Sequence, residues 1–207
     1  MYCDENGAGV TSTGNVPGNV SGSSIYLHCG DNQTVSGNLV FGSHATPLST
    51  FGTGLFGGCN TGGVDPIDEN ITATVSTNIW MVTTQGGSIF NHGQIYPTAD
   101  ETYTNNVYWS TQTPPTLNFP VTPAINSSFA QWQAVGEDVG GVVADPMVAD
   151  LAVGNFTLLP GSPALQRGFQ QIEGGWGTTM SQPPTSRHSS QDLPPRRKSG
   201  TRSKCAN

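Results

Sequence analysis

The sequence predicts an all-β chain whose segments stack as successive coils of a parallel solenoid. The 207 residues include 27 Gly and 15 Pro, and only 10% are charged. No stretch of a dozen residues shows an apolar stripe at helical spacing. Short runs rich in Val, Ile, Thr and aromatic residues, separated by Gly and Asn, are typical of strands and turns. A recurring Asn–aliphatic motif indicates how these strands are arranged.

That motif occurs near the end of β-like runs, clearly at Asn38, Asn78 and Asn106 and more weakly at Asn15, with spacings of 23, 40 and 28 residues. Uneven spacing of a constant motif indicates coils that keep their strands and vary their loops. Asn tolerates the left-handed conformation of a tight corner, and its amide can bond the Asn one coil away. We therefore expect Asn38, Asn78 and Asn106 to form a structural ladder at equivalent corners. The alternative is that such pairs are simply common in an Asn-rich β protein.

Composition divides the chain into two parts. Residues 1–173 are predicted to form the coils and a closing segment. Residues 174–207 contain Pro183-Pro184, many Ser residues and the run Pro194 to Lys198, with almost no apolar side chains. A segment of this kind cannot bury a core, so we expect a disordered tail that makes no stable contact with the body.

The net charge of −7 is unevenly distributed. Arg167 is the one basic residue before position 187 and stands against 13 acidic residues, which leaves the body near −12 and the tail near +5. Such a body repels nucleic acid and disfavours polyanionic glycans such as pectate or alginate. We expect a polysaccharide partner that is neutral rather than polyanionic, and no nucleic acid. The sequence has no apolar run of membrane-spanning length.

Two features suggest an extracellular protein. The four cysteines could form disulfides in an oxidising compartment; Cys29–Cys59 is the leading pair, although three full pairings are possible. N-x-S/T sequons for glycosylation occur at Asn19, Asn32, Asn70, Asn126 and Asn155. The segment Met1 to Glu5 lacks the charged start and apolar core of a signal peptide, so we expect that a signal peptide is not present in this chain.

Several segments resemble a known family. The run Ser24 to Asn32, followed by Val35 to Phe41, resembles the coil signature of right-handed parallel β-helix repeat proteins of the pectate-lyase-like superfamily. Further on, Trp132, Gly136 and Asp138 precede the segments 144–147 and 160–165, an order similar to the one with which many members end their helix. The resemblance covers roughly residues 20–172.

This resemblance implies a right-handed parallel β-helix, of which the chain would be the C-terminal portion. It also implies a secreted protein that acts on or binds polysaccharide and is glycoside-hydrolase-like if catalytic. One alternative is a non-catalytic glycan-binding or structural surface module. Another is a different all-β fold, such as an antiparallel jelly roll.

Catalytic candidates follow from the chemistry of glycan cleavage. Lyases of the family use an Arg or Lys base with calcium, and the coils contain no Lys or Arg before Arg167, so β-elimination is not expected. Hydrolysis needs two carboxylates about 5–9.5 Å apart. The candidate carboxylates are Asp31, Asp65, Asp68, Glu69, Asp100, Glu101, Glu137 and Asp138. His92 resembles the motif histidine of polygalacturonases without its basic companion. For each of these residues the alternative is a solvated or purely structural side chain.

Binding candidates are fewer. Trp80, Tyr108 and Trp109 could stack on sugar rings, the alternative being core packing. The segment Asp65 to Asn70 offers oxygen ligands for calcium but lacks the glycine and spacing of a defined calcium loop. We therefore predict no metal site and no cofactor, with calcium as the remaining possibility.

Overall fold

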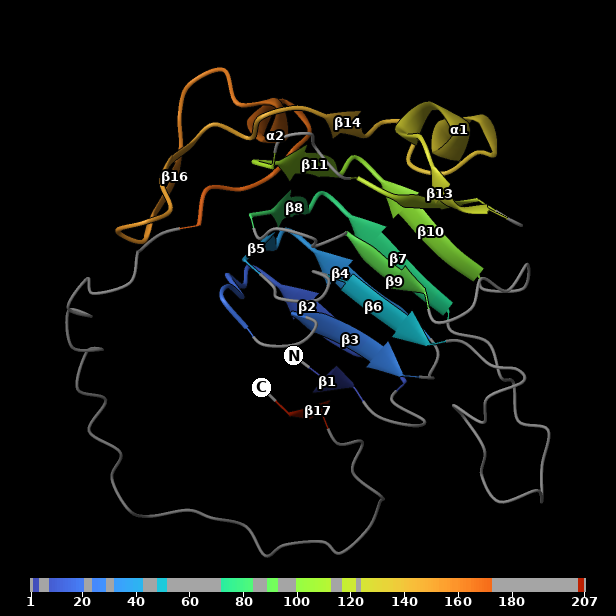
Figure 1. Ribbon diagram of the computed structural model, residues 1–207. Coiled ribbons are helices and arrows are strands. Elements are labelled where there is room, and N and C mark those ends of the chain that lie inside the picture. The colour runs from blue at the N-terminus through green and yellow to red at the C-terminus, as the bar shows by residue number, and fades with distance from the viewer. Residues whose placement is uncertain are drawn as a thin grey trace, which may run out of the picture.

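In the computed structural model of the chain, strands predominate (Figure 1). The structure describes residues 2–3, 8–20, 24–28, 32–42, 48–51, 72–83, 89–92, 100–112, 117–121, 124–172 and 205–206. Helix is confined, within these ranges, to α1 (Phe129–Ala134) and α2 (Pro163–Gln166). The all-β prediction is confirmed at this level.

Most strands belong to three parallel sheets (Figure 1). The first sheet contains β1 (Tyr2–Cys3), β3 (Ile25–His28), β6 (Leu48–Phe51) and β9 (Phe90–His92). The second contains β2 (Thr11–Thr13), β4 (Gln33–Ser36), β7 (Thr72–Ser76) and β10 (Asp100–Thr104). The third contains β5 (Leu39–Phe41), β8 (Ile79–Val82), β11 (Val107–Ser110) and β14 (Val142–Val143).

The chain visits the three sheets in the same order on successive passes, through β3, β4 and β5, then β6, β7 and β8, then β9, β10 and β11. This order and the parallel pairing are compatible with a β-helix-like fold. An antiparallel jelly roll is wrong for these segments, because the pairings of β2 to β11 along the three sheets are parallel.

Antiparallel pairing is found elsewhere. It joins β12 (Phe119–Val121) to β13 (Ala124–Ser127) and β15 (Val148–Asp150) to β16 (Asn155–Leu158). It also joins β1 to β17 (Cys205–Ala206). The expectation that the tail makes no contact with the body is therefore wrong at residues 205–206; residues 174–204 lie outside the described ranges.

The third sheet is buried on both faces, as parallel sheets usually are. On one face Val40, Trp80 and Tyr108, which share one register position, belong to a core that also contains residues of the other two sheets. On the other face Leu39, Ile79 and Val107 pack with apolar side chains of the closing segment, residues 148–172. Those side chains are Phe156, Leu158, Ala164 and Phe169. The closing segment thus lies along the outside of the stack.

An aromatic cluster lies at the β14 end of the core that the three sheets share. Ser128 caps α1 through a capping box with Gln131, which fixes the start of the helix. Trp132 of α1 then packs against Phe90 and Tyr103, with ring centroids 5.8 and 5.3 Å apart. Bringing α1 over this end shields the last buried rings from water.

Each corner between the second and third sheets has one residue in the same left-handed backbone conformation. The residue before the Asn of the motif is left-handed: φ is 66° at Gly14, 64° at Gly37, 56° at Thr77 and 58° at Asn105. We expected the motif Asn itself to take this conformation, and that detail is wrong. The Asn side chain turns inward instead, since Asn38, Asn78 and Asn106 are fully or almost fully buried.

The buried asparagines form a continuous row of hydrogen bonds. Asn38 donates to Asn78 Oδ1 from its backbone N and from Nδ2, both at 3.0 Å. Asn78 donates to Asn106 Oδ1 in the same two ways, at 2.9 and 3.0 Å. The second Nδ2 proton goes to a main-chain oxygen, that of Ser12 for Asn38 and of Val35 for Asn78. Every polar atom of these side chains is therefore satisfied while buried.

We predict that Asn78→Ala destabilises the fold strongly. The substitution leaves the buried donors of Asn38 and the main-chain oxygen of Val35 without partners. The free energy of unfolding should fall by on the order of 3 kcal/mol, as expected when several buried polar groups lose their bonds. Urea denaturation measures this change. The matched control Asn155→Ala removes an exposed Asn and should cost about 0.5 kcal/mol or less; equal losses would contradict the ladder's role.

Candidate functional site

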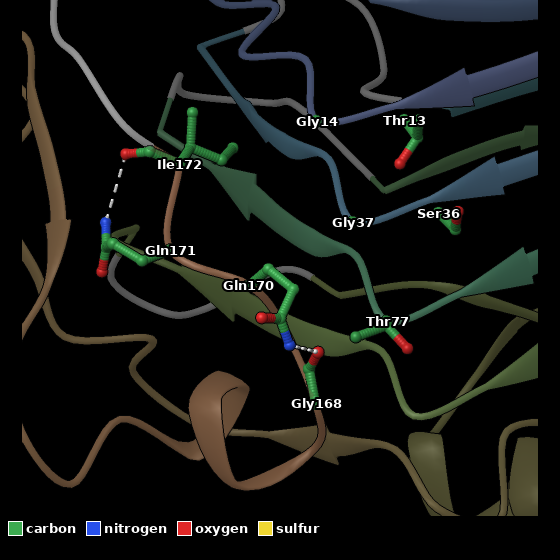
Figure 2. A pocket seen from close by; sticks show the side chains of 9 residues that line it. All are labelled: Thr13, Gly14, Ser36, Gly37, Thr77, Gly168, Gln170, Gln171 and Ile172. Carbon is green, nitrogen blue, oxygen red and sulfur yellow. Dashed lines mark hydrogen bonds between the residues drawn. The ribbon is translucent and has the colours of Figure 1, made fainter.

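A groove lies between the corners of the stack and the end of the closing segment (Figure 2). Its volume is about 480 Å³. The lining residues are Thr13, Gly14, Ser36, Gly37, Thr77, Gly168, Gln170, Gln171 and Ile172. One wall therefore repeats from coil to coil, and the other is a single extended segment that runs beside it.

The corner backbone explains why the groove is open. Gly14 occupies a left-handed position, and a Cβ built there would meet nothing within 4 Å. Across the groove, Gln171 Oε1 accepts a hydrogen bond of 2.9 Å from the backbone N of Leu158. This bond joins two parts of the closing segment to each other, and Ile172 packs against the apolar side chains on the outer face of the third sheet.

The groove is uncharged and is lined by both polar and apolar atoms. Thr13, Ser36 and Thr77 lie on the corner side and Gln170 on the side of the closing segment, whereas the amide of Gln171 is turned away from the corners (Figure 2). None of the nine lining residues carries a charge. Gln170 is exposed and donates from Nε2 to the main-chain oxygen of Gly168 at 3.0 Å. Neutral donors and acceptors of this kind suit a ligand rich in hydroxyl groups.

A second cavity of about 820 Å³ lies beside β11 and α1 and is lined by Trp109, Leu117, Phe119 and Phe129, among others. Trp109 is half-buried and could still present part of its ring. The stacking role expected for Trp80 and Tyr108 is wrong, however, because neither side chain is exposed at all and no ring face is left for a sugar.

The structure brings three of the candidate carboxylates to one end of the second sheet. Tyr103 donates its hydroxyl proton to Glu101 Oε2 at 2.5 Å, and the backbone N of Asp138 donates to Tyr103 O at 3.0 Å. Burial raises the pKa of Glu137, and the nearby charges of Glu101 and Asp138 raise it further, against a backbone hydrogen bond at Tyr103. Glu137 thus holds its proton more readily than an ordinary glutamic acid.

Asp138 ends the asparagine ladder. Its carboxylate accepts from Asn106 N at 3.3 Å, from Asn106 Nδ2 at 3.1 Å and from the Tyr108 hydroxyl at 2.7 Å. A Cβ at Gly141 would lie 2.6 Å from this carboxyl group, so a glycine is needed there. Burial raises the pKa of Asp138, although its hydrogen bonds with Tyr108 and Asn106 and the charge of Arg167 oppose the rise.

The sequence did not predict this structural role, because the corner residue is an Asp rather than an Asn, although Val139 follows it as an aliphatic residue follows each Asn of the motif. A usable signal was present in the spacing: Asp138 follows Asn106 by 32 residues, within the range set by the earlier intervals. Each Asn of the ladder donates a hydrogen bond to the corner side chain of the next coil. The residue that follows the last Asn therefore needs only to accept, as a carboxylate does.

Other expected site residues are only partly described. Asp31, Asp65, Asp68, Glu69, Cys29, Cys59 and Asn70 lie outside the described residues, as does the calcium segment. For His92, Asp100 and Asn126 the structure describes the backbone alone, in β9, β10 and β13. Asn19, Asn32 and Asn155 are exposed, which glycosylation would require.

In the described part of the chain, no three His, Cys, Asp or Glu residues gather closely enough to hold a metal ion. Neither of the helices found there has the length and apolarity needed to span a bilayer. Comparison of the chain with protein-family models, with curated proteins and with solved structures gives no match.

We predict that Asp138 makes stability depend on pH. Because the folded state raises the pKa above the ordinary 3.8, the unfolded carboxyl loses its proton first as pH rises. The free energy of unfolding should therefore fall as pH rises from 3.8 through the raised value. Urea titrations at a series of pH values measure this slope, which should be shallower in Asp138→Asn.

Glu137 contributes to the slope with the same sign, so some pH dependence should remain in Asp138→Asn. Asp150→Asn is the matched control, since Asp150 is exposed. If Asp138→Asn kept the full slope, or if the control removed it, the assignment to Asp138 would be refuted.

Proposed function

We propose that the chain forms a right-handed parallel β-helix and binds a neutral polysaccharide along the corner groove. The repeated order of visits to three parallel sheets supports the solenoid. Crossover connections between parallel strands of one sheet are almost always right-handed, which supports the handedness. The resemblance to pectate-lyase-like repeat proteins points the same way.

The observation that carries the binding proposal is the uncharged, hydroxyl- and amide-rich lining of the groove. Its wall repeats with the coils, at about 4.8 Å per coil. An extended glycan chain also presents similar hydroxyl groups at regular intervals, so successive sugars could meet successive corners. The strongly acidic body would repel polyuronates and leave neutral chains as ligands. Secretion and glycosylation at the exposed sequons belong to this proposal.

Gln170→Ala tests the groove. Soluble xylan and mixed-linkage glucan should bind the wild-type chain in affinity gel electrophoresis, while polygalacturonate should not. Loss of one amide contact of about 1 kcal/mol should weaken binding about fivefold. Gln166→Ala removes an exposed glutamine of α2 that does not line the groove and should leave affinity unchanged. Binding that survives Gln170→Ala undiminished, or that favours polygalacturonate, would refute the proposal.

Glycoside hydrolysis is the second candidate, because Glu137 has the raised pKa of a general acid and Glu101 lies near it. In that case Glu137 would protonate the leaving oxygen and Glu101 would act as the second carboxylate. We predict that polygalacturonate and alginate yield no unsaturated products, with or without calcium, because the described coils hold no Lys or Arg before Arg167.

New reducing ends from xylan would establish the hydrolase, and Glu137→Gln should then abolish them while Asp150→Asn, an exposed control, leaves the rate unchanged. Unsaturated products from either polyuronate would contradict the prediction. Absence of reducing ends would leave the chain a binding module.

A further inference from the structure

The outward face of the second sheet carries two straight rows of hydroxyl groups. In the first row Thr11, Thr34, Thr74 and Thr102 are directly paired from strand to strand. In the second row Thr13, Ser36, Ser76 and Thr104 are paired in the same way. Every one of these eight positions is exposed or partly exposed, whereas the residue between the two rows is buried in each strand.

The geometry of a parallel sheet fixes the spacing of this array. Neighbours within a row are separated by the strand spacing of about 4.8 Å. The two rows are two residues apart along the strands, which is about 6.6 Å. The hydroxyls therefore occupy the points of a two-dimensional lattice that extends over four strands, β2, β4, β7 and β10 (Figure 1).

The chemistry of the lattice is uniform. Six of the eight residues are Thr and two are Ser, and none is charged. Each Thr offers a hydroxyl that donates and accepts beside a methyl group that does neither. Water beside such a surface is held by the hydroxyls and restricted in orientation by the methyls. The β-branched side chain is also stiff, so the array keeps its spacing.

We infer that this face binds the surface of ice. Ice is an uncharged ligand with order in two dimensions, and oxygen atoms on its faces repeat at intervals similar to both spacings of the array. A rigid lattice of hydroxyls holds water in place at little further entropic cost, since the ordering is built into the sheet. A single glycan chain would use one row, whereas ice uses both rows and all four strands.

This inference does not depend on glycan binding in the groove. The first row, Thr11 to Thr102, does not line the groove, although Thr13 and Ser36 of the second row do. Substitutions in the first row and at Gln170 therefore separate the two activities.

The test is nanolitre osmometry on the purified full chain, which measures the gap between the melting and freezing temperatures of a single ice crystal. The wild-type chain should open such a gap and shape the crystal. Thr74→Lys places a long charged side chain in the middle of the first row and should remove most of the gap. Thr157→Lys makes the same change at an exposed Thr of β16, on the closing segment, and should keep the gap.

Circular dichroism should show the same β signal for all three proteins, so that loss of the fold does not account for the result. Absence of any gap in the wild-type chain would overturn the inference, as would equal gaps in the wild type and Thr74→Lys or loss of the gap in Thr157→Lys. Binding to microcrystalline cellulose that Thr74→Lys abolishes, without any effect on ice, would assign the face to a crystalline glycan instead. Gln170→Ala should leave the freezing gap intact whatever it does to glycan binding.

Discussion

The buried row of side-chain amides is the constraint on which the rest of the structure depends. Its hydrogen bonds all point one way, from Asn15 through Asn38, Asn78 and Asn106 to Asp138. Amides aligned in this manner polarise one another, so the row is stronger than its separate bonds. Since Asn38, Asn78 and Asn106 each also donate to a main-chain oxygen of the neighbouring coil, the row fixes the corners in register. In-register corners in turn place like residues above one another in the second and third sheets.

The register of the stacked coils accounts for the arrangement of residues both in the interior and on the surface. Where apolar positions align on the third sheet, both faces need cover, and the closing segment provides it on the outer side through Phe156, Leu158 and Phe169. By lying there, the segment also creates the groove, because residues 168–172 run beside the corners without filling the space over them. On the second sheet the same alignment brings hydroxyl residues into rows. The groove and the two hydroxyl rows are thus consequences of the stacking of the coils.

The all-β class, the parallel pairing and the asparagine ladder could be predicted from the sequence, because they depend on which residues occur close together along the chain. Asn38, Asn78 and Asn106 each precede an aliphatic strand, and that pattern is visible without a structure. The sequence did not predict which side of a strand faces inward when both faces are covered, and the expectation that Trp80 and Tyr108 contact sugars fails for this reason. Strands buried on both faces show no alternation to resolve the two. The end of the ladder at Asp138 and the groove were also not predicted, because each is formed by residues distant in sequence that meet only after the coils stack.

Asp138 gives the row of amides a definite end. An asparagine both receives and passes on a hydrogen bond, so it can be followed by another copy of itself, whereas an ionised carboxylate only receives. A further coil stacked beyond this corner would receive no hydrogen bond from the side chain of Asp138. The exchange of one amino group for one oxygen, at a buried position, thus ends the row of amides.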